Sequence, residues 1–126
     1  MFQNDMTYET LLEDALNTLP AFKKEYVKNI DGNIIDKDAG MHVVFGYVFV
    51  PVLEKALDEK DKPTIHELFD YLEKMSLCED SDVVAVCDQS VLEIICGEYK
   101  DKTLLPYMGK GTTEGLNTVR QYIMEP

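Results

Sequence analysis

The sequence predicts an all-α fold of five or six helices, arranged as a compact bundle or as a short HEAT-like stack of helical hairpins. Apolar residues recur at intervals of three and four along most of the chain, which is the spacing of one face of a helix. A Leu-Glu pair recurs at residues 53, 72 and 92, and two such units approach the period of about 40 residues of HEAT-type helical pairs. The length of 126 residues is that of one ordinary domain.

The first predicted helix lies within residues 7–27, and Thr7 is its expected N-cap. Pro20 interrupts the pattern, because proline lacks an amide hydrogen and crowds the preceding turn, so we expect a kinked or split helix. Residues 29–40 are rich in Asn, Asp and Gly, which predicts a loop. The apolar positions of the helical region are Leu12, Ala15, Leu16, Leu19, Phe22 and Tyr26.

Residues 41–59 combine features of a strand and of a helix. Their β-branched and aromatic side chains favour a strand, but the apolar positions do not alternate and instead follow a helical face. Phe45 and Phe49 widen that face until the first half is apolar nearly all round, as in a helix surrounded by neighbours. We predict one helix with a bend at Pro51, whose missing amide lies opposite the Tyr47 carbonyl.

Two amphipathic helices are predicted next. The first covers residues 64–75, where Thr64 and Glu67 have the spacing of a capping box. The second follows the acidic break at residues 78–82, with Asp80 among its expected N-terminal caps and Gly97 as its expected C-cap.

The C-terminal part is predicted to be a loop followed by one more helix. Pro106, Gly109 and Gly111 punctuate residues 99–111, which favours a loop with one short turn at most. A final helix starts at about Thr112 and directs Leu116, Val119 and Ile123 inward. We therefore expect a single α-helical domain over residues 1–126, with a core at about 8–98 and a C-terminal loop and helix at about 99–126.

The charge of the chain limits its partners. With 24 acidic and 12 basic residues the net charge is −12, which repels nucleic acid and anionic membrane surfaces. No basic region followed by an apolar run opens the chain, and no apolar run reaches the roughly 20 residues that span a bilayer. The cysteines, Cys78, Cys87 and Cys96, are an odd set without close pairing, which suits a reducing compartment. A cytoplasmic protein is the expectation.

No catalytic signature emerges from the motifs. His42 and His66 are the only histidines, and neither lies in a nucleophile motif. The sequence GKGTT at residues 109–113 lacks the earlier glycine of a phosphate loop, so at most weak anion binding is expected there. Carboxylate pairs such as Asp88 with Glu93 are explained by solvated helix faces, because nothing in the sequence indicates burial. We expect no catalytic residue, no metal site and no cofactor.

Acidic residues are concentrated in one stretch of the chain. Residues 53–82 contain ten acidic and four basic residues. If successive hairpins bring the two interhelical turns to one edge, an acidic rim able to steer a basic protein partner results. The predicted partner-binding residues are Asp58, Glu59, Asp61, Glu79, Asp80 and Asp82.

The central segments resemble a known family. The segments are HVVFGYVFVPVLEKALDEKD, ELFDYLEKM and SVLEIICGE, within residues 8–98. They resemble DUF7674, a family of small bacterial all-helical proteins of unknown function. The resemblance implies a helical fold and supplies no catalytic residue. Small acidic helical proteins of similar appearance include antitoxin and immunity partners, which is an analogy of class.

The leading hypothesis is a non-enzymatic, intracellular protein-binding module that uses the acidic edge. An immunity or antitoxin-like role is one form of this hypothesis. The alternative is a small-molecule or metal-binding enzyme with a pocket near His42, Tyr47 and the Pro51 bend, where proline frees a carbonyl. A self-associating structural module is the third possibility. No nucleic acid or membrane is expected as a partner.

Overall fold

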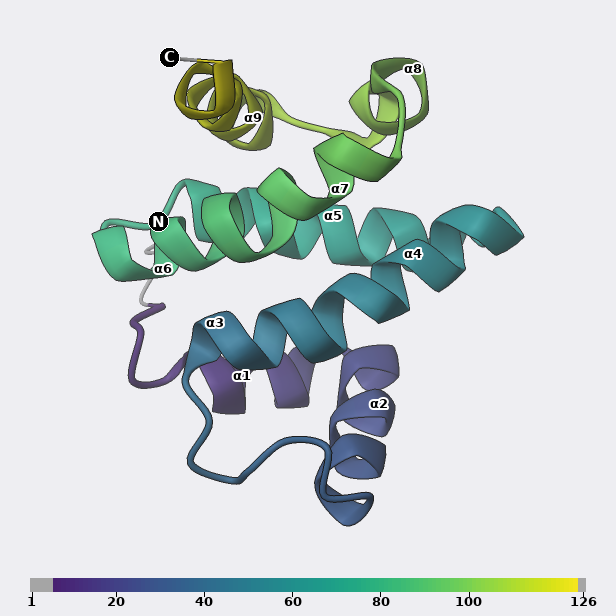
Figure 1. Cartoon of the computed structure of the whole chain (residues 1–126), viewed down its shortest axis with the longest axis vertical. Coiled ribbons are helices and arrows are strands. Elements are labelled where there is room, and N and C mark those ends of the chain that lie inside the picture. Colours follow the sequence, from purple (N-terminus) through teal and green to yellow (C-terminus); the bar gives the residue numbers. More distant parts are fainter. Residues whose placement is uncertain (1–5, 125–126) are drawn as a thin grey trace.

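The computed structural model describes residues 6–124, and it is all-α in this part, with no strand. Figure 1 shows that α1 and α2 lie at one end of the long axis and α8 and α9 at the other, with the remaining helices between them. Residues 6–124 form seven continuous helical segments, not five or six. The additional segment is α8 (Asp101–Leu104) with the 3₁₀ turn η3 (Leu105–Tyr107), in a stretch predicted as a loop.

The predicted split at Pro20 is confirmed. α1 (Leu11–Thr18) ends before Leu19, which is extended, and α2 (Pro20–Asp31) starts with the proline. A proline at the first helical position is favourable because its missing amide hydrogen would have no partner there. The N-cap of α1 is Thr10, three residues after the predicted Thr7, and the two hydroxyls lie 2.9 Å apart.

Residues 41–59 form one continuous helix, as predicted, with a π turn at its centre. α3 (Met41–Val44), the π turn η1 (Phe45–Phe49) and α4 (Val50–Glu59) follow without interruption. The Val50 amide donates to the Phe45 carbonyl, five residues earlier, immediately before Pro51. Lys60 ends α4 in the left-handed conformation, at φ 56°.

α5 (Lys62–Ser76) is capped by Asp61 and not by the predicted Thr64–Glu67 pair. The Thr64 amide and hydroxyl both donate to the Asp61 carboxylate, which therefore satisfies a donor of the first turn.

A second helix with a π turn follows α5. It consists of α6 (Ser81–Cys87), the π turn η2 (Asp88–Leu92) and α7 (Glu93–Glu98). Asp80 is its N-cap, as predicted, whereas Gly97 lies inside the helix and Tyr99 is the C-cap. The π turns η1 and η2 pack against each other.

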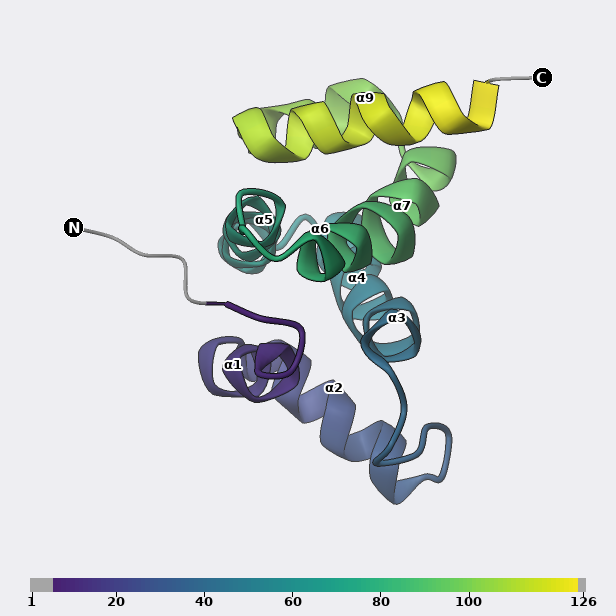
Figure 2. The same ribbon diagram turned by 90° about the vertical axis from the view of Figure 1, so that its left-hand side faces the viewer.

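α9 (Lys110–Met124) lies across the outer side of α5, α6 and α7, as Figure 2 shows. It contacts α5, η2 and α7, and begins two residues before the predicted start at Thr112. Leu116 and Val119 are buried, as predicted, whereas the side chain of Ile123 lies outside the described part.

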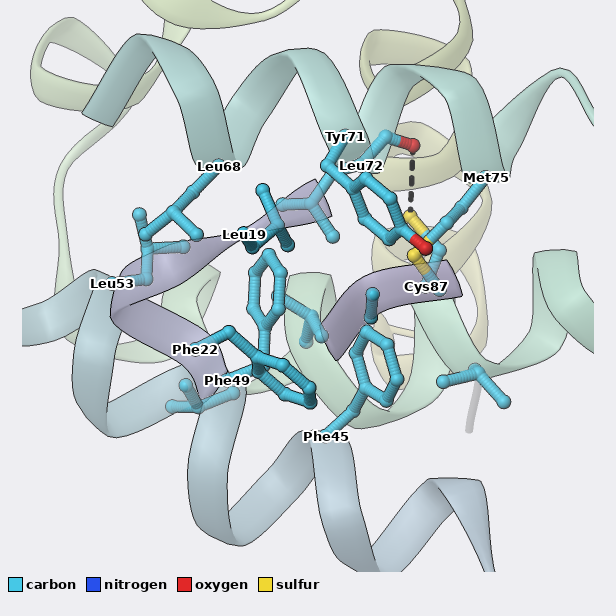
Figure 3. Close-up of a cluster of buried hydrophobic side chains, with 14 of the residues drawn as sticks. Leu19, Phe22, Phe45, Phe49, Leu53, Leu68, Tyr71, Leu72, Met75 and Cys87 are labelled. Atoms are coloured by element: carbon cyan, nitrogen blue, oxygen red, sulfur yellow. Dashed lines mark hydrogen bonds between the residues drawn. The ribbon is translucent and has the colours of Figure 1, made fainter. Parts of the chain in front are cut away.

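The core centres on aromatic rings of α2 and η1. The ring centroids of Phe22 and Phe45 are 5.5 Å apart, and those of Phe45 and Phe49 are 5.2 Å apart. Figure 3 shows these rings beneath the apolar face of α5, with Cys87 donating to the Leu72 carbonyl. The strand-like residues of the 41–59 helix therefore reflect burial on several sides.

Candidate functional site

The six predicted partner-binding residues fall into two separate groups. Asp58, Glu59 and Asp61 surround the turn between α4 and α5, and Glu79, Asp80 and Asp82 surround the turn between α5 and α6. The 15 residues of α5 separate the two turns, which at 1.5 Å per residue is a distance of about 22 Å. The two groups therefore lie at opposite ends of α5 and do not form one edge.

Three of the six residues have local structural roles. Asp61 caps α5, and Asp58 accepts a hydrogen bond of 2.8 Å from the Tyr99 hydroxyl. Asp80 accepts from the amide of Tyr8 and from that of Asp82, both at 2.9 Å. These amides hold the pKa of the Asp80 carboxyl below its usual value, with that of Tyr8 contributing most. The other three, Glu59, Glu79 and Asp82, are exposed.

The Tyr8–Asp80 hydrogen bond adds an acidic neighbour that sequence reasoning missed. It brings the start of the described chain, with exposed Glu9, beside the α5–α6 turn. The Cys78 thiol, which donates to the Met6 carbonyl at 2.9 Å, holds the same two segments together. We call Glu9, Glu79, Asp80 and Asp82 the acidic face. Residues 6–22 and 75–99, which supply it, contain no lysine or arginine.

The backbone amides of the GKGTT segment bind a carboxylate of the chain itself. Glu73, on α5, accepts from the Gly111 amide at 2.7 Å and from the Thr112 amide and hydroxyl at 2.9 Å. Burial alone would raise the pKa of Glu73, but these hydrogen bonds lower it below its usual value. The position that an anion would take at the start of α9 is therefore filled by Glu73.

The surroundings of His42, where the alternative hypothesis expects a pocket, contain one side-chain contact with another helix. His42 Nδ1 and Ser90 Oγ are 2.7 Å apart and connect α3 with η2. His42 itself is exposed, Tyr47 is 62% exposed, and no carboxylate of the described residues is hydrogen-bonded to the imidazole. Within residues 6–124, no group of three His, Cys, Asp or Glu side chains is arranged to hold a metal ion. The contact thus supplies a histidine and a hydroxyl without the third, orienting group.

A cavity of about 420 Å³ lies between the α6–η2–α7 helix and α9. This size falls in the range of about 300–1,000 Å³ typical of small-molecule sites. Asp88 and Glu93 both line it; Glu93 is exposed, as expected of a solvated helix face, whereas Asp88 is half-buried, which corrects that expectation for Asp88. The π turn explains their proximity, because the Glu93 amide bonds to the Asp88 carbonyl five residues before it. The lining residues are Ser81, Val84, Ala85, Asp88, Gln89, Glu93, Thr118 and Val119.

Asp88 is the least satisfied polar side chain of this cavity. Its Oδ1 atom is buried and has no hydrogen-bond partner among the described residues. Desolvation raises the pKa of Asp88. The same oxygen packs against Gly115 of α9, where any side chain would overlap it. Sequence reasoning found this residue but not its burial.

The comparisons with known proteins identify a family and nothing more specific. A family model described as a domain of unknown function, DUF7674, matches residues 12–123. The match therefore continues through α8 and into α9, beyond residue 98 where the recognisable motifs end. No curated protein and no solved structure matches the chain. None of the helices in residues 6–124 is long and apolar enough to cross a membrane.

Proposed function

The chain belongs to the DUF7674 family, and we propose that it is a non-enzymatic, intracellular module that binds a basic protein partner at the acidic face. The observation that carries this proposal is the Tyr8–Asp80 hydrogen bond, because it joins two acidic segments that contain no lysine or arginine. Opposite charges across an interface accelerate encounter and disfavour wrong partners. An immunity or antitoxin-like role, in which the chain covers a basic toxin domain, is the specific form that we propose.

The proposal includes the arrangement of the helices. A short HEAT-like stack of hairpins is supported by the contacts of α4 with α5 and of α5 with α6, which are successive in the chain. Such a stack exposes its interhelical turns along its sides. The acidic face belongs to one of these turns, where exposed carboxylates can reach a partner without rearrangement of the core.

Charge variants at the two ends of α5 test the proposal. The triple variant E9Q/E79Q/D82N removes three charges from the acidic face and retains Asp80, which caps α6. The matched control D58N/E59Q/D61N removes three charges at the other end, and asparagine still caps α5. With a partner isolated on the wild-type protein, we expect association of the face variant to be slower by about tenfold or more at low salt, and that of the control to be unchanged. Equal rates for both variants would refute the acidic face.

The alternative function, an enzyme or metal-binding protein near His42, Tyr47 and Pro51, is favoured only by the His42–Ser90 contact. Replacement of His42 by alanine distinguishes the partner-binding proposal from the enzyme hypothesis. The partner-binding proposal expects unchanged affinity for the partner and no bound metal in the purified protein. The enzyme reading expects a loss of ligand or metal with this substitution.

A further inference from the structure

The cavity beside η2 lies where α9 comes close to the Asp88 carboxylate. Gly115 is buried, and a Cβ atom there would overlap Asp88 Oδ1. A glycine therefore permits the close approach of α9, and Thr118 and Val119, one turn further along, form the opposite wall of the cavity. The wall formed by α6 is apolar at Val84 and Ala85.

The charge of Asp88 has no compensation within this cavity. The lining includes a second carboxylate, Glu93, but no lysine, arginine or histidine. Residues 75–99, which contribute most of the lining, carry six acidic residues and no basic one, as counted from the sequence. Asp88 is half-buried and its Oδ1 atom has no hydrogen-bond partner among the described residues, so desolvation favours either protonation of this carboxylate or its pairing with a cation from outside the chain.

The chemistry of the lining narrows the choice of cation. Two carboxylates are too few for a metal ion held by protein ligands alone, and no metal-binding group was found among the described residues. An ammonium or guanidinium group instead needs two or three hydrogen-bond acceptors, which carboxylate and amide oxygens supply. The apolar side chains of Val84, Ala85 and Val119 suit the methylene groups next to such a cation.

We propose that this cavity binds an organic cation, a primary ammonium or a guanidinium on a short aliphatic chain, with Asp88 and Glu93 as its acceptors. The cation forms charge-assisted hydrogen bonds with the two carboxylates and leaves its methylene groups against the α6 and α9 walls. One such cation is a free small amine, and another is the lysine or arginine side chain of a protein. None of the lining residues belongs to the acidic face, so this inference does not depend on the proposed function.

Nuclear magnetic resonance titration of the full chain tests the inference with defined probes. Agmatine represents a free amine, N-acetyl-arginine methylamide represents a protein side chain, and 1-pentanol is a neutral control of similar size. We expect at least one cation to shift the amides of residues 84–93 and 115–119, and 1-pentanol to have no such effect. Binding of agmatine alone would identify a free amine, and binding of the capped arginine would identify a protein side chain.

Two variants and one wild-type measurement complete the test. Asp88→Asn removes the charge with little change of shape and is expected to weaken binding at least tenfold. Glu98→Gln, an exposed residue of the same helix outside the cavity, is the matched control and is expected to bind as the wild type does. In the wild type, the carboxyl ¹³C resonance of Asp88 is expected to titrate at lower pH when the cation is present.

The inference is overturned if neither cation shifts these amides, if Asp88→Asn binds as tightly as Glu98→Gln, or if 1-pentanol binds equally well. The carboxyl titration needs no variant, so it decides the question even if Asp88→Asn does not fold. Absence of cation binding in the cavity would not contradict partner binding at the acidic face, because none of the four residues of that face lines the cavity.

Discussion

Replacement of Glu73 by glutamine should loosen the attachment of α9 to the rest of the molecule. The substitution keeps the shape of the side chain and removes the charge that accepts hydrogen bonds from Gly111 and Thr112. Hydrogen bonds to charged groups contribute about 1.5–3 kcal/mol each, and a carboxylate at a helix N-terminus contributes about 0.3–1 kcal/mol. Because glutamine still offers one acceptor oxygen and the site is half-exposed, we expect a loss of about 2–3 kcal/mol in the free energy of unfolding.

Thermal and chemical unfolding followed by circular dichroism measure this loss. For a chain of this length, about 3–5 °C is lost per kcal/mol, so the melting temperature should fall by roughly 10 °C at pH 7. Glu67→Gln, an exposed substitution on the same helix, is the control and should change it by less than about 2 °C. Hydrogen exchange should become faster in α9 before it does in α5.

The effect of pH on this difference follows from the lowered pKa of Glu73. A carboxyl whose pKa is lower in the folded state stabilises the protein fully above its unfolded pKa of about 4.3, and loses that contribution as the pH falls through the folded pKa. The difference in the free energy of unfolding between the wild type and Glu73→Gln should therefore be largest at pH 7 and should decrease progressively below about pH 4. A gap of the same size at pH 7 and pH 3, or no gap beyond that of Glu67→Gln, would refute this account of α9.

Three further predictions concern packing and caps. Gly115→Ala should destabilise the protein by about 1–3 kcal/mol, because the new methyl group overlaps Asp88 Oδ1 and comes within 3.0 Å of Leu92. Asp88→Ala should relieve part of this loss, and an additive double-mutant cycle by urea unfolding would contradict the overlap. Lys60→Gly should stabilise the protein by up to about 1 kcal/mol, since Lys60 ends α4 at positive φ, and an unchanged or lower melting temperature would argue against strain at this residue. Tyr99→Phe should cost about 1 kcal/mol, because the Tyr99 hydroxyl donates its one hydrogen to Asp58 at 2.8 Å, with the Glu54 carbonyl 3.3 Å away, and the cost should shrink in an Asp58→Ala background.

The positions of the long helices could be predicted from local pattern, whereas their connections could not. The helix at residues 41–59 was predicted through Pro51 because its apolar residues cover more than one face. The π turn before the proline has no comparable signal. α8 was missed because it is only four residues long, and short helices depend on tertiary contacts such as those of its buried Leu104.

The arrangement of the acidic residues depended on contacts between distant parts of the chain. Nothing near Asp80 in the sequence indicates that Tyr8, 72 residues away, donates to it, and Glu73 lies 38 residues from Gly111. The Asp88–Glu93 spacing was visible, but a spacing of five residues does not reveal burial when the helix contains a π turn. The absence of basic residues over residues 75–99 was the one available signal, because a buried carboxylate there has no nearby cation in the sequence.

Salt-graded affinity isolation from a lysate of the source organism tests the central claim, a basic partner at the acidic face, most directly. The wild type, the face variant E9Q/E79Q/D82N and the control D58N/E59Q/D61N are immobilised in parallel, and the proteins released by rising salt are identified. We expect the wild type and the control to retain the same basic protein, released within the first few hundred millimolar of salt, and the face variant to lose it. Retention of one partner by all three proteins, or a partner that is acidic and insensitive to salt, would contradict the claim.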